Sequence, residues 1–229
     1  MKVFKWRSPE WWSWLGGQKR RPTIVSVTRY IQSHQKIVVF HGCRPLDVES
    51  YYTNGIRVAD VAELNRSAKE IFSSVGFPEI TESSISSAIS SINHVEQGEL
   101  YVVIDKEDLI NKSGHYMIYG SERICGIGAY LFEKSGFDCR QILKRHGIPT
   151  VFHVQISVKS IPKDQIETLA ERVHNDVWEG YRRIRKPFCF DFPFMLVESV
   201  PGTFIVGHEH PTVIPDPLFN YQLYHHDSQ

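Results

Sequence analysis

Two short segments of the chain place reactive side chain types where a ligand can reach them. The first is FHGCRP at residues 40–45, in which His41 ends an apolar run and Gly42 follows it. A histidine titrates near neutral pH, and a neighbouring glycine lets a ligand approach the main chain. The segment therefore indicates a ligand site at a strand end. The alternative is a histidine whose ring is satisfied by a nearby carbonyl group.

The second segment is HYMIYGSE at residues 115–122. Tyr119 precedes Gly120 and a predicted helix start at which Ser121 is the N-cap. The free N–H groups of a helix N-terminus suit an anion, and an aromatic ring beside them can stack on a planar ligand. The alternative is a core tyrosine followed by an ordinary helix cap.

Histidines near the C-terminus give a third, weaker candidate. Residues 208–211 read HEHP, and His225 and His226 follow. Alternate side chains of an extended segment point the same way, so His208 and His210 are a possible metal-ligand pair. The sequence lacks a helical H-E-x-x-H and a close cysteine pair, and we predict no resident metal. A phosphate loop, a dinucleotide fingerprint and a nucleophile elbow are also absent from the sequence.

Hydrophobic periodicity predicts the elements that position these segments. Strands are expected at residues 37–40, 100–105, 115–119, 150–156, 188–197 and 203–206. Helices are expected at residues 46–56, 59–74, 81–96, 122–134, 140–146 and 163–185. Because the strands cluster and do not alternate strictly with helices, the pattern predicts an α+β fold. No internal repeat or linker is visible, so residues 23–229 are expected to form a single domain with a His- and Pro-rich tail.

Residues 1–22 differ in composition from the rest, because they contain four of the five tryptophans. We expect this Trp-rich segment to pack on the domain, or else to extend from it toward a partner or a membrane surface. The segment ends in a basic run at residues 19–21. A second basic cluster ends the helix predicted at residues 163–185. It suits the helix dipole and is read either as a solvated turn or as a phosphate patch.

Composition excludes some classes of protein. The 229 residues carry 26 Lys and Arg against 26 Asp and Glu. A neutral chain does not coat nucleic acid by bulk charge, although a local basic patch stays possible. No run of 18 apolar residues exists, so no membrane span is expected. The four cysteines are scattered, which is typical of reduced thiols and predicts a cytoplasmic protein.

Several of these pieces together resemble the ADP-ribosyltransferase superfamily. They are FHGCRP at residues 40–45, NGI at 54–56, YMIYGSE at 116–122 and FMLVESVPGTFIVG at 194–207. The likeness spans residues 37–207 in short stretches. It implies a split, mainly antiparallel sheet flanked by helices, and NAD as the substrate.

The resemblance also implies roles for individual residues. His41 would bond the nicotinamide ribose, Gly42 would hold the carboxamide through its backbone, and Tyr119 would stack on the nicotinamide ring. Arg44 and Ser121 complete the implied NAD-binding set. The family's acid is assigned to Glu198, with Asp191 and Glu209 as alternatives.

The expected function is therefore transfer of ADP-ribose from NAD to a macromolecular acceptor, which is a protein, DNA or RNA. A toxin-like role follows only by analogy of fold. If no acid is placed at the site, the fold would bind NAD without transfer, or would resemble the tRNA phosphotransferase branch, which lacks that acid. Two readings compete: a non-catalytic interaction module, and a metal hydrolase that uses the HEH segment.

Overall fold

The computed structural model describes residues 2–74, 76–92, 98–184, 186 and 188–226. Its main sheet has the strand order β5-β3-β2-β4-β6, with antiparallel neighbours, and β1 joins β2 in parallel. The strands are β1 (Val3–Phe4), β2 (Lys36–Cys43), β3 (Leu100–Val103), β4 (Thr150–Ser157), β5 (Pro193–Leu196) and β6 (Ile205–Glu209). The predicted single-domain α+β fold with a mainly antiparallel sheet is confirmed.

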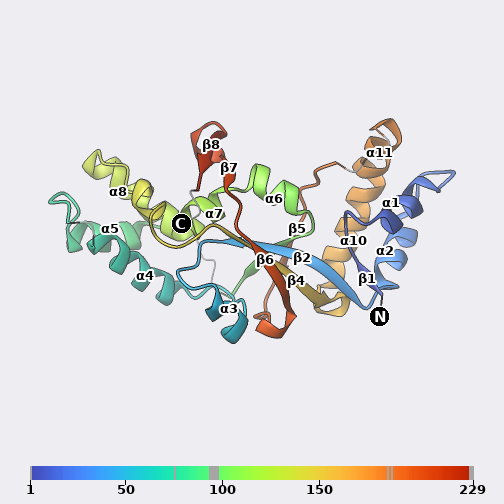
Figure 1. The fold of residues 1–229 in the computed structure, drawn as a ribbon, viewed down its shortest axis with the longest axis horizontal. Coiled ribbons are helices and arrows are strands. Elements are labelled where there is room, and N and C mark those ends of the chain that lie inside the picture. Colours follow the sequence, from blue (N-terminus) through green and yellow to red (C-terminus); the bar gives the residue numbers. More distant parts are fainter. Residues whose placement is uncertain (1, 75, 93–97, 185, 187, 227–229) are drawn as a thin grey trace.

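Helices gather at both ends of this sheet (Figure 1). At one end lie α4 (Val61–Ser73), α5 (Glu82–Ser91), α7 (His115–Tyr119), α8 (Glu122–Ser135) and α9 (Arg140–Leu143), with α6 (Lys106–Lys112) beside the sheet. At the other end lie α1 (Pro9–Gly16), α2 (Ile24–Gln32), α10 (Lys163–Arg172) and α11 (Trp178–Ile184). Helix α3 (Glu49–Asn54) follows β2. Side chain caps from Thr23, Asp60 and Ser121 start α2, α4 and α8.

The strands alternate between two hydrophobic cores, because successive side chains point to opposite faces of a sheet. On β4, Phe152 and Val154 belong to the first core, which the N-terminal helices, α10 and α11 complete. Val151 belongs to the second core, which α4 to α9 complete. On β2, Val39 lies in the first core and Phe40 packs against the second. This alternation decides which residues share a site.

The Trp-rich segment packs into the first core. Trp6, Trp11 and Trp12 are buried there, and the partly buried Trp14 stacks on Tyr30 with ring centroids 4.3 Å apart. The Ser8 side chain accepts a hydrogen bond from the Trp11 amide (3.2 Å) and so caps α1. These tryptophans therefore stabilise the domain from within and leave little aromatic surface for a partner.

The C-terminal tail contributes a second, two-stranded sheet. Strands β7 (Val213–Asp216) and β8 (Gln222–His225) pair antiparallel, and β7 contacts α6 and α7. The turn between them has left-handed backbone at Asn220 and Tyr221, with φ of 51° and 58°. The tail thus folds back as a hairpin onto the second core.

Some predicted elements are wrong or are bounded differently. Residues 115–119 form helix α7, not the expected strand. Met117, Ile118 and Tyr119 are consecutive and all buried, and so short a run of apolar and aromatic residues has no diagnostic period. The strand expected at residues 188–197 is reduced to β5. The helix expected at residues 163–185 contains a π-helical turn, Val173–Val177, between α10 and α11. Residues 93–96 of the helix expected at 81–96 lie outside the described residues.

Candidate functional site

His41 lies near the end of β2, between β3 and β4, and its ring is fixed by the main chain. Its Nδ1 is 3.0 Å from the carbonyl oxygen of Tyr101 on β3. Because a carbonyl only accepts, Nδ1 carries the proton and Nε2 of the neutral ring is the acceptor. Burial lowers the pKa of His41, and the bond to Tyr101 partly offsets that effect. His41 is therefore a neutral imidazole held in one tautomer.

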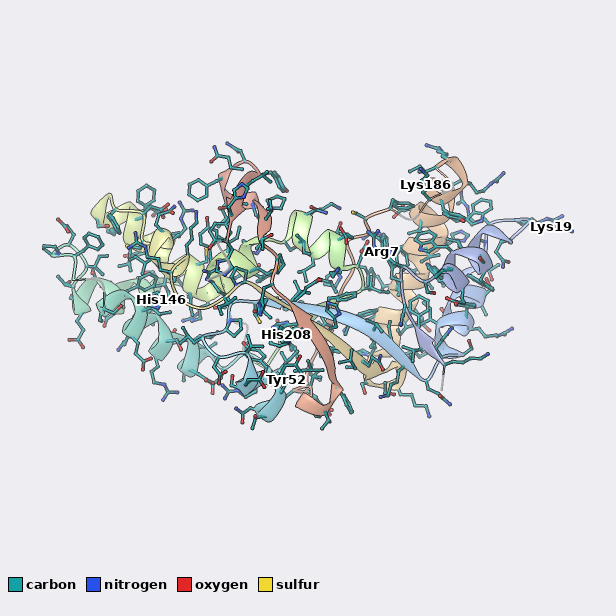
Figure 2. All side chains as sticks on the ribbon, in the orientation of Figure 1. Arg7, Lys19, Tyr52, His146, Lys186 and His208 are labelled. Carbon is teal, nitrogen blue, oxygen red and sulfur yellow. The ribbon has the colours of Figure 1, made fainter. Side chains whose placement is uncertain are left out.

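The same face of the sheet carries aromatic and imidazole side chains around His41. Phe152 is its cross-strand neighbour on β4, and the ring of Tyr51 stacks on Phe152 with centroids 4.6 Å apart. His208 pairs with Phe152 on β6, and its Nδ1 lies 2.8 Å from the hydroxyl of Tyr52. Figure 2 labels Tyr52 and His208 beside one another near the middle of the molecule. Phe152 is fully buried, so the rings of this group that a planar, hydrogen-bonding ligand could reach are those of Tyr51, Tyr52 and His208.

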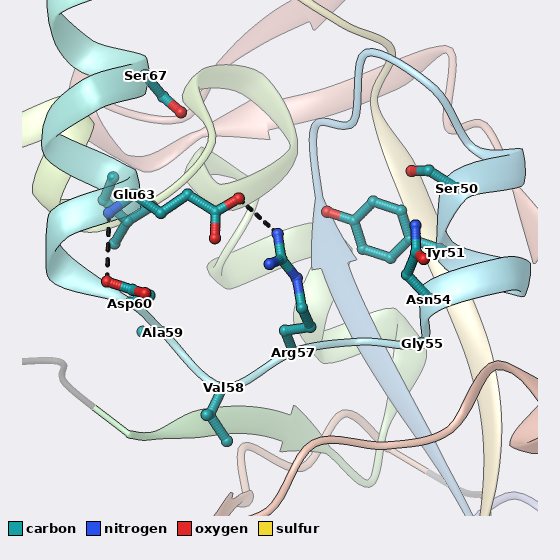
Figure 3. A pocket seen from close by; sticks show the side chains of 11 residues that line it. Ser50, Tyr51, Asn54, Gly55, Arg57, Val58, Ala59, Asp60, Glu63 and Ser67 are labelled. Carbon is teal, nitrogen blue, oxygen red and sulfur yellow. Dashed lines mark hydrogen bonds and ion pairs between the residues drawn. The ribbon is translucent and has the colours of Figure 1, made fainter.

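A pocket of about 240 Å³ lies next to this face. Its lining comes from α3, the first turns of α4 and the segment between them, and includes Tyr51, Arg57 and Glu63. An ion pair joins Arg57 and Glu63, and Asp60 accepts hydrogen bonds from the first amides of α4 (Figure 3). The pocket is therefore lined by a positively charged guanidinium group and by negatively charged carboxylates.

Tyr51 connects the pocket with β2. Its hydroxyl forms a hydrogen bond with the thiol of Cys43, which lies on the same face of β2 as His41. Burial raises the pKa of Cys43 to about 12, although the bond to Tyr51 acts in the opposite direction. Cys43 is therefore an uncharged thiol at neutral pH and is no nucleophile.

Gly42 faces the opposite side of the sheet. A Cβ added to it would lie 3.3 Å from the side chain of Leu109, in the second core. Its cross-strand partner, Val151, is in the same core. The glycine therefore makes room for α6 to pack on β2, a role that the resemblance did not imply.

Tyr119 also belongs to the second core, so the structure does not bring it onto the face that carries His41. Its hydroxyl donates to the buried carboxylate of Asp216 on β7. Burial and then this hydrogen bond raise the pKa of Tyr119. The ammonium of Lys144 lies 5.4 Å from its ring centroid. The expectation that His41 and Tyr119 contact one nicotinamide group is wrong, because His41 lies on the face of β2 that carries Phe152, whereas helix α7, which carries Tyr119, packs in the second core.

Arg44 and Ser121 are engaged within the protein. The guanidinium of Arg44 donates from Nε to the carbonyl of His146 (2.9 Å) and from Nη1 to that of Met117 (3.0 Å). It therefore ties the end of β2 to α7 and to the chain after α9. The Ser121 hydroxyl accepts from the Ile124 amide (3.3 Å), as expected for an N-cap.

The three candidate acids lie in different places. Glu198 is exposed in the turn after β5, and this turn meets the pocket: the neighbouring Ser199 accepts a hydrogen bond from the Val58 amide (3.1 Å). Asp191 is exposed between two buried phenylalanines. Glu209 faces the second core side and pairs with Lys106 (2.9 Å). Glu198 is thus the candidate whose segment is joined to the pocket wall.

The HEH segment does not assemble a metal centre. The rings of His208 and His210 lie 5.0 Å apart, but Glu209 points to the other face of the sheet. Within the described ranges, no group of three His, Cys, Asp or Glu side chains is arranged as metal ligands. All four cysteines are free thiols.

Sequence reasoning did not identify Tyr51, Tyr52 and Phe152 as parts of this face. One signal was available: Phe152 alternates with His153 in a predicted strand, and two tyrosines follow the His41 strand. Asp216, the partner of Tyr119, carried no signal, because it lies 97 residues away along the chain.

No protein-family model, no curated protein and no solved structure matches this chain. Among the residues that the structure describes, none of the helices combines the length and the apolar character needed to cross a bilayer.

Proposed function

We propose that the protein is an NAD-dependent ADP-ribosyltransferase whose site is the His41 face of the sheet and the adjoining pocket. The observation that supports this best is the state of His41. A neutral imidazole with Nδ1–H fixed by Tyr101 presents Nε2 as an acceptor, which is what a ribose hydroxyl requires. The resemblance of residues 40–45 gives His41 the same role.

The chemical step is substitution at the ribose carbon that carries nicotinamide. The bond from that carbon to the pyridinium nitrogen breaks, and its electron pair leaves with nicotinamide. The acceptor's nucleophile forms the new bond to that carbon and gives up its proton to solvent water. A carboxylate near the ribose stabilises the developing positive charge, an effect worth about 3 kcal/mol. We assign this role to Glu198, because its turn is bonded to the pocket wall.

Tyr119 has no part in this proposal, because its hydroxyl and its ring are occupied on the other face. A second candidate function is NAD binding without transfer. It is favoured by one observation: within the described part of the chain, no carboxylate is hydrogen-bonded or ion-paired to His41.

The test separates binding from transfer. NAD binding is measured by calorimetry, and nicotinamide release by chromatography. We expect His41→Ala to weaken binding at least tenfold, since each lost hydrogen bond to a ligand leaves a polar group unpaired. Glu198→Gln should keep binding and slow release by about a hundredfold. Tyr119→Phe is the matched control and should change neither quantity.

Three results are decisive. If the wild-type protein does not bind NAD, or if His41→Ala binds it as well as wild type does, the proposal is wrong. If NAD binds but no nicotinamide appears in the presence of cell extract, binding without transfer replaces it.

A further inference from the structure

Basic side chains gather at the end of the molecule formed by the loop between α1 and α2 and by the end of α11. We call this set the basic tip. All of its members are exposed: Lys19, Arg20, Arg21, Arg182, Arg183 and Lys186. Figure 2 shows Lys19 and Lys186 at the same end of the structure, although they lie far apart in sequence.

Packing between α1 and α11 holds the two parts of the basic tip together. The ring centroids of Trp12 and Tyr181 lie 4.9 Å apart. A Cβ added to Gly16 would come within 2.8 Å of the Tyr181 ring, so the helix can approach this closely because residue 16 is glycine. The relative position of the two basic segments is therefore set by the first core.

Two arginines of the basic tip are positioned by one indole. The guanidinium groups of Arg21 and Arg182 lie 5.9 Å and 4.7 Å from the ring centroid of Trp178. Arg21 also donates to Glu179 over 3.0 Å. Stacked guanidinium groups lose less conformational freedom when they bind a ligand.

Acidic side chains do not neutralise the basic tip. Glu179 lies within the influence of Arg21 first, and then of Arg182 and Arg183, and these groups lower its pKa. The preceding acid on the helix, Asp176, is paired with Arg172 (3.0 Å). Among the described residues of the basic tip, one carboxylate, Glu179, is thus ion-paired with one of six cations, in a chain whose net charge is zero.

We propose that the basic tip binds the phosphate backbone of double-stranded nucleic acid. Guanidinium groups match phosphate oxygens in geometry as well as in charge, and such contacts need no base sequence. A membrane surface fits less well, because Trp11 and Trp12 are buried and Ile184 (55% exposed) is the large apolar side chain that the described tip presents. This inference does not depend on NAD chemistry.

The experiment measures binding of a labelled DNA duplex of about 20 base pairs by fluorescence anisotropy. With four or five phosphate contacts, the affinity should fall by about 150- to 500-fold between 50 and 200 mM salt. The double variant Arg182→Glu/Arg183→Glu should weaken binding at least tenfold and flatten the salt dependence. Because Arg182 packs on Trp178, a second double variant in the loop, Lys19→Glu/Arg20→Glu, repeats the test without touching packed side chains.

The matched control is Arg66→Glu/Lys69→Glu, which makes the same change of charge on exposed residues of α4, at the other end of the sheet. It should stay within about threefold of wild type. The proposal is overturned if wild-type protein does not bind the duplex at 50 mM salt, or if the control weakens binding as much as the tip variants do. Binding to phosphatidylserine vesicles but not to the duplex would also overturn it.

Discussion

On one face of the sheet His41 keeps a ring nitrogen available, whereas on the other face Tyr119 has committed both its hydroxyl and its ring. The two residues lie on elements that touch each other, and both are largely enclosed. The difference is in their partners: His41 bonds a main chain carbonyl through one nitrogen, while Tyr119 bonds the buried Asp216 and lies under Lys144. A buried polar residue with spare bonding capacity is a candidate for ligand binding, and one without it is structural.

The largest effect on the free energy of unfolding is expected from removing the Phe152 ring, which packs beside His41 on the same face of the sheet. Phe152 is fully buried and stacks with Tyr51. Phe152→Ala should lower the free energy of unfolding by about 3–5 kcal/mol, as measured by urea denaturation. The substitution leaves a cavity, and the paired strands around it move too little to fill it. Phe132→Ala is the control, since Phe132 is 39% exposed. Equal losses in the two variants would contradict a continuous core beneath His41.

An intermediate effect is expected on the Tyr119 face. Tyr119→Phe removes the hydroxyl that donates to Asp216, whose side chain is buried, so the carboxylate loses a donor. We expect the free energy of unfolding to fall by about 1–3 kcal/mol. Tyr221→Phe, at a tyrosine that is 56% exposed, should change it by less than about 0.5 kcal/mol. A loss of NAD binding in Tyr119→Phe without loss of stability would reverse the comparison between the two faces.

The smallest effect is a pH dependence from His41. Burial lowers the pKa of the folded-state ring below the unfolded value of about 6.5. Above a pH of about 6.5 the ring is neutral in both the folded and the unfolded state, and His41 does not reduce the free energy of unfolding. As pH falls through the interval between the unfolded and folded values, the unfolded chain binds the proton first, so stability is lost by at most about 1.4 kcal/mol per pH unit.

This loss is measured by comparing urea denaturation at several pH values for wild type and His41→Gln. The variant should lose less stability on acidification than wild type does. His225→Gln changes an exposed histidine and serves as control. Parallel stability curves for wild type and His41→Gln would show that the ring is not kept neutral by the fold.

The sequence alone determined the features that depend on local patterns. The strand that leads into His41, the cap at Ser121 and the α+β class all follow from side chain types at fixed spacing. The helix at residues 115–119 did not follow, since five apolar or aromatic residues fit either element and such a short run has no diagnostic period.

Only the tertiary structure decided which chemistry-bearing residues meet. His41 and Gly42 are adjacent in sequence, yet they face opposite sides of the sheet because successive residues of a β-strand alternate. Tyr119 lies in the second core, on the side that Gly42 faces. The partners of His41 and Tyr119, Tyr101 and Asp216, lie 60 and 97 residues away along the chain. Contacts of this kind depend on which strands pair and in what register, and a linear pattern does not contain that information.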